Sequence, residues 1–491
     1  MEAGGGGSWL VAARRALGCR FGVDARALAA FRVAVGVILL VDLLLRARYL
    51  DAFYTDSGVL PRATNAALYP TLSSLSLHAL SGAAWLQWAL FAVAAALASL
   101  LVVGYRTRPV AVGSWAMLAS LQLRNYVVLN GGDTVLLVAL FLALFLPLGE
   151  RWSVDALADG RRESPRTRVA GFGTAALLSQ VVLVYATNAV FKLRGDVWTS
   201  GVAVRYVFQL DRFTVLFGDV LAGVPALLVA INWAWLAMLA ASPLLVATVG
   251  RVRTALVAAF GAAHLGMALT MDLGFFPHAM LACLLVFLPS PVWDRVESAA
   301  APVDAAVRER VEPPALPVYS GPLVPARARS AAARVAPAVT ATVFVAGLLW
   351  QGVAVGYVSA PAATPVDPAE HSWKLFAPAP PTADGWFVVT GTLGSGATAD
   401  LYPHADTSRD RPPDSAATYP SMRWRKYLAA VRGNELVRRQ FADYLCRWGA
   451  ERHGEAVETV TIDYVRESVA LDAPDATERL ELGSYRCPVL R

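Results

Sequence analysis

Long runs of apolar residues constrain this chain more than any other feature of its sequence. Several runs approach the roughly 20 residues that a helix needs to cross a hydrocarbon core about 30 Å thick. Charged residues make up only 16% of the chain, whereas a soluble protein carries about a quarter. The sequence therefore predicts a polytopic α-helical membrane protein. We expect nine spans, at residues 28–48, 82–104, 109–128, 131–149, 172–193, 225–249, 252–273, 275–291 and 336–358.

Arginine residues indicate the orientation of these spans. They gather in the N-terminal segment and in every second loop after it, for example at Arg106, Arg151 and Arg251. Loops rich in Lys and Arg face the cytoplasm. Nine spans then place the N-terminus in the cytoplasm and the C-terminus outside, and we expect a multi-pass plasma-membrane protein. The net charge of +6 follows from these loops, and no nucleic-acid-binding motif or basic stripe accompanies it.

The composition divides the chain into five segments. Residues 1–27 form a cytoplasmic N-terminal segment, and residues 28–291 form a transmembrane core of eight spans. The stretch 292–335 is rich in Ala, Pro and Arg, which predicts a flexible cytoplasmic linker. It leads to the ninth span, 336–358. Residues 359–491 are more polar and predict an extracytoplasmic α+β domain.

This C-terminal domain combines strand and helix patterns. "GWFVVTGTLGSGATADLY" predicts a β-hairpin with a Gly-Ser-Gly turn, and "VETVTIDYVRESV" and "ERLELGSYRC" predict two more strands. Apolar residues at helical spacing occupy the stretch between them. Cys446 and Cys487 would face an oxidising compartment, so we expect a disulfide between them rather than two unpaired thiols. No cysteine or histidine has the spacing of metal ligands, and we expect no metal site.

Ionisable residues at membrane depth are costly, so each is a candidate functional group. Under the expected topology, one set of polar and aromatic residues lies toward the outer face. It comprises Arg124, Asn125, Asn130, Asp133, Lys192, Asp196, Trp198, Asp272 and His278. These residues either line a polar chamber that opens outward under the C-terminal domain or form the ordinary polar ends of helices. "LQLRNYVVLNGGDTVLL" favours the chamber, because it places Arg124 and Asp133 within apolar sequence. His264, in the middle of the seventh span, is interpreted as a core histidine.

Lys192 ends the fifth span, in "NAVFKLRGDVWTSG". A lysine that extends to the membrane surface is most expected on the cytoplasmic side, and Lys192 lies on the other. Partial burial would favour the neutral amine, which is a usable base. A nearby Asp133 would instead hold the positive charge. The sequence leaves both alternatives open.

Four stretches of the chain together carry a family resemblance. They are "FRVAVGVILLVDLLLRARYLDAFYTDSGVLP", "LRNYVVLNGGD" followed by "FLPLGERWSVDA", "YATNAVFKLRGDVWTSG", and the C-terminal "HSWKLFAP", "RWRKYL" and "YLCRW". In this order they resemble the HTTM family, the membrane domain of vitamin K-dependent gamma-carboxylases, in its prokaryotic form. The resemblance covers nearly the whole chain.

The resemblance implies an activity and a catalytic residue. The carboxylases oxidise a vitamin K hydroquinone with oxygen, and a neutral lysine, matched here by Lys192, starts this by deprotonating the hydroquinone. The strong base so formed removes a proton from a protein glutamate, to which carbon dioxide adds. Reduced vitamin K or a menaquinol-like hydroquinone, oxygen, carbon dioxide and a secreted protein or peptide are the implied reactants.

Two differences from the carboxylases bear on this implied activity. Asp133 stands where the carboxylases have a histidine, and the segment after Trp373 lacks their histidine and arginine residues. The alternative function is a non-catalytic membrane protein of the same fold that binds a quinone, a lipid or a partner.

Overall fold

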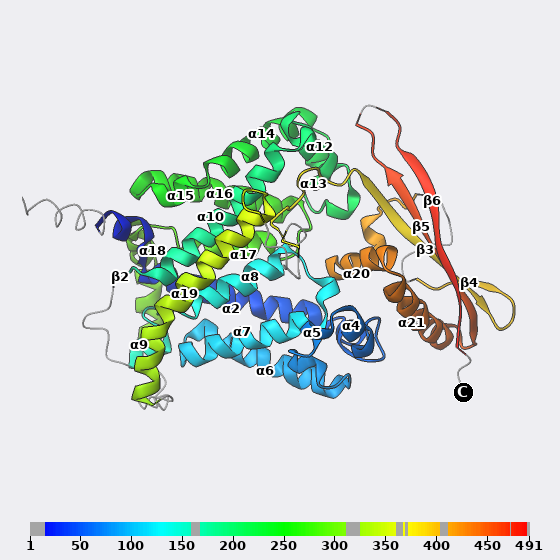
Figure 1. Ribbon diagram of the computed structural model, residues 1–491, viewed down its shortest axis with the longest axis horizontal. Coiled ribbons are helices and arrows are strands. Elements are labelled where there is room, and N and C mark those ends of the chain that lie inside the picture. Colours follow the sequence, from blue (N-terminus) through cyan, green and yellow to red (C-terminus); the bar gives the residue numbers. More distant parts are fainter. Residues whose placement is uncertain are drawn as a thin grey trace, which may run out of the picture.

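The computed structural model describes residues 15–158, 167–310, 325–359, 367–368, 372–402, 411–471 and 473–488. Helices form one body, and a β-sheet stands at its side (Figure 1). The helices of the body are α2 (Ala25–Ala47), α3 (Leu50–Tyr54), α4 (Arg62–Leu68), α5 (Pro70–Ser73), α6 (Ala84–Val103), α7 (Thr107–Arg124), α8 (Gly131–Ala143), α9 (Val154–Ala158), α10 (Phe172–Leu193), α11 (Asp196–Thr199), α12 (Ala203–Phe208), α13 (Gly218–Ala222), α14 (Pro225–Ala241), α15 (Leu244–Ala247), α16 (Gly250–Thr270), α17 (Phe276–Leu285), α18 (Ser290–Arg310) and α19 (Ala326–Ala354).

The apolar helices identify the chain as a mostly helical membrane protein. Among the described residues, five helices are long and apolar enough to span a bilayer: α2, α6, α10, α16 and the Arg334–Ala354 part of α19. A sixth span results if α17 and the first part of α18, which meet at an angle of 99°, count as one. The apolar helices α8 and α14 are shorter. α8 has 13 residues, so it is about 20 Å long and shorter than the hydrocarbon core.

The stretch 292–335 differs from the flexible linker that its composition predicts. Within the described residues, α18 continues to Arg310 and α19 begins at Ala326. Ala, Arg and Glu are strong helix formers, and they outweigh Pro302 inside α18. Residues 311–324 lie outside the described part of the chain.

The C-terminal domain is a four-stranded antiparallel sheet with two helices. The sheet order is β4-β3-β5-β6, with β3 at Ala383–Leu393, β4 at Thr398–Asp400, β5 at Val457–Ser468 and β6 at Ala476–Arg486. β3 and β4 form the predicted hairpin. The helices α20 (Met422–Gly433) and α21 (Glu435–His453) lie between the sheet and the helical body (Figure 1). A disulfide joins Cys446 in α21 to Cys487 after β6.

One apolar core joins the C-terminal domain to the helical body. It contains residues of α2 and α3 together with residues of α20, α21 and the sheet. The ring centroids of Phe53 and Trp424 lie 5.0 Å apart, and the Tyr427 hydroxyl donates to the Val59 carbonyl at 2.8 Å. The domain is therefore fixed against the membrane helices by packing as well as by the covalent chain.

Candidate functional site

Lys192 lies at the C-terminal end of α10 and is buried, with 2% of its surface exposed. Helix α10 packs against α8, α14 and α19. Tyr185, Asn188 and Lys192 are spaced three and four residues apart, so they share one face of α10. All three side chains are buried. The amine therefore belongs to a buried polar stripe and does not extend into water.

The Lys192 amine has neutral partners. Its Nζ donates to the Leu375 carbonyl at 3.0 Å and lies 3.3 Å from the centroid of the Trp198 ring. Within the described residues, no ion pair joins Lys192 to an acidic side chain. The structure thus brings Lys192 and Trp198 together and pairs neither with Asp133.

Residues 373–378 cover the end of α10. The Asn188 side-chain amide lies within hydrogen-bonding distance of three successive carbonyls, those of Trp373 at 3.2 Å, Lys374 at 2.7 Å and Leu375 at 3.3 Å. The Trp198 indole N–H donates to the Phe376 carbonyl at 2.8 Å. Three side chains of α10 and α11 therefore hold four consecutive main-chain oxygens beside the amine.

Asp133 is held at the start of α8 by its own capping interactions. Its Oδ2 accepts from the Asn130 amide at 2.9 Å, while the Asn130 side chain accepts from the Gly132 amide at 2.6 Å. This reciprocal cap satisfies N–H groups that a helix start leaves free, and it orients the carboxylate. The Oδ1 atom accepts from Arg46 at 2.7 Å and from Arg423 at 3.0 Å. Two guanidinium groups thus engage the charge of Asp133.

Asp133 is one member of a buried ionic cluster, formed by Asp42, Arg46, Asp133 and Arg423 with the Tyr54 hydroxyl. Arg46 also binds Asp42 at 2.7 Å and Tyr54 at 2.7 Å, and Arg423 binds Asp42 at 2.6 Å. Burial and Arg46 lower the pKa of Arg423, but Asp133 and Asp42 outweigh them and raise it overall. The two carboxylates and two guanidinium groups balance in charge, so each buried charge has an oppositely charged partner that offsets its loss of hydration.

The other predicted polar residues lie in several places. Arg124 donates to the carbonyls of Leu60 and Tyr54, and Asn125 donates to that of Phe53, so both hold α3 and the segment that follows it. Asp272 pairs with Arg425 of α20 at 3.5 Å. Asp196 and His278 are exposed.

The comparison with protein families concerns the helical body. The family model of the HTTM domain matches residues 22–293, more than half of the chain. The chain belongs to the HTTM domain family. No curated protein and no solved structure matches the chain. The HTTM region supplies Asn188, Lys192 and Trp198, whereas Leu375 and Arg423 come from the chain after it. The amine and the ionic cluster are therefore completed by contacts from outside the HTTM region.

Sequence reasoning missed several buried partners. Asp42 and Arg46 stand four residues apart inside the first apolar run, so one turn of helix brings their opposite charges together; this signal was present. Arg423 carried no such signal, since it is 290 residues from Asp133. The interpretation of His264 as a core histidine agrees with the structure. Its side chain is buried, and its Nε2 forms a hydrogen bond of 2.8 Å with the Tyr185 hydroxyl.

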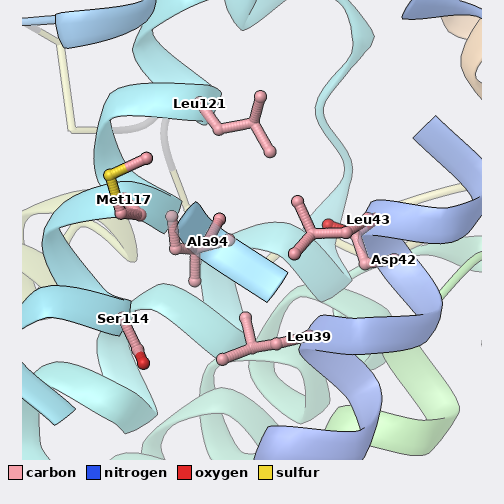
Figure 2. A pocket seen from close by; sticks show the side chains of 8 residues that line it. Leu39, Asp42, Leu43, Ala94, Ser114, Met117 and Leu121 are labelled. Atoms are coloured by element: carbon pink, nitrogen blue, oxygen red, sulfur yellow. The ribbon is translucent and has the colours of Figure 1, made fainter. Parts of the chain in front are cut away.

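A small pocket lies elsewhere in the HTTM region, between α2, α6 and α7. Figure 2 shows the apolar side chains that line most of it, with Ser114 and Asp42 as polar members. The lining residues are Leu39, Asp42, Leu43, Ala94, Ser114, Met117, Leu118 and Leu121. None belongs to α10, so this pocket is separate from the Lys192 amine.

Proposed function

We propose that this HTTM protein is an integral-membrane, vitamin K-dependent carboxylase-like enzyme with Lys192 as its base. The observation that carries the proposal is a buried primary amine whose described contacts are a carbonyl oxygen and an aromatic ring. A lysine accepts a proton only as the uncharged amine, and a carboxylate partner would hold it charged. The HTTM domain itself occurs in proteins of this carboxylase-like class.

The donor groups around the amine support a hydroquinone as the ligand, because its oxygen atoms can accept hydrogen bonds. When bound, the hydroquinone and dioxygen supply a strong base as they become the epoxide and water. Lys192 accepts the proton of a phenolic hydroxyl. The Asn188 amide and the Trp198 indole N–H, which hold carbonyl oxygens here, are suited to orient the ligand's oxygen atoms. Carbon dioxide then adds to a glutamate of a secreted protein or peptide, or to another acceptor.

Asp133 has a positioning role in this proposal. Its carboxylate is paired with Arg46 and Arg423. These two positive charges offset the negative charge of Asp133, so it does not hold the Lys192 amine in its protonated form. It thereby fixes the start of α8, which packs against α10. Asp133 therefore stands where the carboxylases have a histidine without becoming the counter-ion of Lys192.

We also propose the membrane placement that the arginine pattern predicts. Nine crossings, counting the shorter α7, α8 and α14, put the N-terminus in the cytoplasm and the C-terminal domain outside the plasma membrane. The Cys446–Cys487 disulfide supports this placement, because disulfides persist in oxidising compartments. A secreted acceptor would then meet Lys192 from the outer face.

The test supplies membranes containing the protein with reduced vitamin K or menaquinol and oxygen, and measures quinone epoxide. We expect wild-type membranes to form epoxide, and both Lys192→Ala and Lys192→Arg to lose it by at least about 10²-fold, the scale of general-base catalysis. Arginine keeps the charge but is not deprotonated in proteins. Equal epoxide from wild type and Lys192→Ala would refute the role of Lys192. Quinone binding without turnover would support the non-catalytic alternative.

A further inference from the structure

Residues 373–378, here called the strap, close the space above the Lys192 amine. They lie between α19, the last membrane helix, and β3 of the C-terminal domain. Asn188, Lys192 and Trp198 all point hydrogen-bond donors at the strap. These are the same groups that the proposed function requires for a ligand's oxygen atoms, so the strap and a ligand compete for them.

The strap is held through its main chain. The acceptors are the carbonyl oxygens of four successive residues, from Trp373 to Phe376. Its side chains contribute packing. The ring centroids of Phe376 and Phe213 lie 5.1 Å apart, and Leu375 packs against the core of the helical body. Hydrogen bonds from side chains to a main chain can pass to another oxygen-bearing group without rearranging α10.

The strap backbone is also unusual at two positions. Leu375 has φ of 30° and Phe376 has φ of 64°, which is uncommon for large side chains without glycine's freedom. Residues in such conformations persist only where surrounding contacts hold them, and they cluster at clamps and switches. The strain favours release of the strap once its hydrogen bonds are exchanged.

We propose that the strap is a displaceable cover and that the structure shows the covered state of the Lys192 site. An oxygen-bearing ligand such as a hydroquinone reaches Asn188, Lys192 and Trp198 only when the strap carbonyls withdraw. The ligand's identity rests on the proposed function, but the covering of Lys192 does not. Because the strap continues into β3, its withdrawal couples access to Lys192 with the position of the C-terminal domain.

Gly195 offers a direct way to displace the strap. A Cβ atom at this position would lie 1.8 Å from the Pro378 carbonyl oxygen, so alanine forces the strap backbone to move. Gly195 has φ of −101°, a value that alanine adopts freely. Gly223 provides the matched control: its Cβ would meet only the Val220 carbonyl oxygen, at an ordinary 3.5 Å.

The test measures how fast a thiol placed at Lys192 reacts with N-ethylmaleimide. Lys192→Cys is made in a Cys19→Ser background, where the free cysteine Cys283 is buried and the disulfide is kept. We expect the thiol to react at least about tenfold more slowly than that of Asp196→Cys, whose position is exposed. Adding Gly195→Ala should speed the Lys192→Cys reaction about tenfold, whereas Gly223→Ala should leave it within about twofold.

A second opening variant guards against misfolding of the first. Asn188→Leu removes the donor to three strap carbonyls and should also speed the reaction, with the unfolding temperature measured for every variant. The proposal fails if Lys192→Cys reacts as fast as Asp196→Cys, or if neither opening variant, once shown to be folded, accelerates it. No quinol turnover enters this assay, so a lack of catalysis and a fixed strap would be separate results.

Discussion

At the scale of single residues, two buried ionisable side chains of the HTTM region, Asp133 and Lys192, have different surroundings. Asp133 accepts hydrogen bonds from two arginines, so a buried charge is compensated there. Lys192 donates to a carbonyl oxygen and lies over an indole ring. The carboxylate of Asp133 is thus paired with opposite charges, whereas the described contacts of the Lys192 amine are with uncharged groups.

Lys192→Met should separate stability from activity. Methionine fills the buried position with a flexible apolar side chain, and replacement of a functional buried lysine tends to be neutral or favourable for stability. We expect thermal unfolding in detergent to show a free energy of unfolding within about 1 kcal/mol of wild type, while epoxide formation is lost. A large loss of stability would mean that Lys192 is mainly structural.

His78, in the 3₁₀ turn Leu77–Ala79, should give the protein a pH-dependent stability. Burial, with the charges of Arg124 and Arg46, lowers the pKa of His78 from 6.5 to about 4. The unfolded chain then binds more protons than the folded one between these values. Stability should therefore be full above pH 6.5 and fall toward pH 4, by on the order of 2 kcal/mol at pH 5.

The measurement compares unfolding of wild type and His78→Gln at pH 7.5 and pH 5. Glutamine keeps a polar side chain for the Ser120 hydroxyl, which lies 2.7 Å from Nδ1 of the histidine, but does not titrate. The loss of stability on acidification should be smaller in the variant. An equal loss in both proteins would exclude His78 as its source.

At the scale of elements, local sequence patterns predict the secondary structure that is determined by residues close together in the sequence. The β3–β4 hairpin follows from a glycine-rich turn between alternating strands. Within 292–335, the described residues of α18 and α19 are helical where a linker was predicted, because composition alone does not separate a linker from a helix. The strap was not visible in the sequence because its acceptors are main-chain carbonyls, which every residue has. Arg423 joins α2 and α8 only through the tertiary fold.

Arg423→Ala should loosen α20 from the membrane helices. It leaves Asp42 and Asp133 buried with Arg46 as the remaining guanidinium of the cluster, and breaking a buried ionic group costs about 3–5 kcal/mol. Thermal unfolding should show this loss. Arg439→Ala, which removes an exposed arginine of α21 that pairs with Glu435 at the surface, should leave the stability close to that of wild type. Equal effects would contradict a structural role for the cluster.

At the scale of the whole molecule, the C-terminal domain completes the HTTM region. It supplies Arg423 to the ionic cluster and packs through one apolar core on α2 and α3. The strap joins the same domain to the amine. The proposed orientation places all of these contacts on the outer side, where the disulfide is stable.

Thiol labelling offers a test of this orientation in intact cells. A membrane-impermeant maleimide should label the thiol of Asp196→Cys, whose position is exposed and lies on the proposed outer side, and should leave Cys19 unlabelled. Cys446 and Cys487 are buried and joined by the disulfide, so they add no background. Removing this bond in Cys446→Ala with Cys487→Ala should destabilise the domain by about 4 kcal/mol, from the 41-residue loop that it closes. Labelling of Cys19 in intact cells would contradict the proposed orientation and place the N-terminus outside.

Chemical rescue tests the central claim most directly, namely that a neutral amine at position 192 is the base. Lys192→Ala membranes receive reduced vitamin K or menaquinol, oxygen and increasing methylamine, and quinone epoxide is measured. The account predicts that epoxide formation returns in proportion to the concentration of uncharged methylamine, and that tetramethylammonium, which has no lone pair to accept a proton, gives no rescue. Epoxide formation by Lys192→Ala at the wild-type rate without any amine would contradict it.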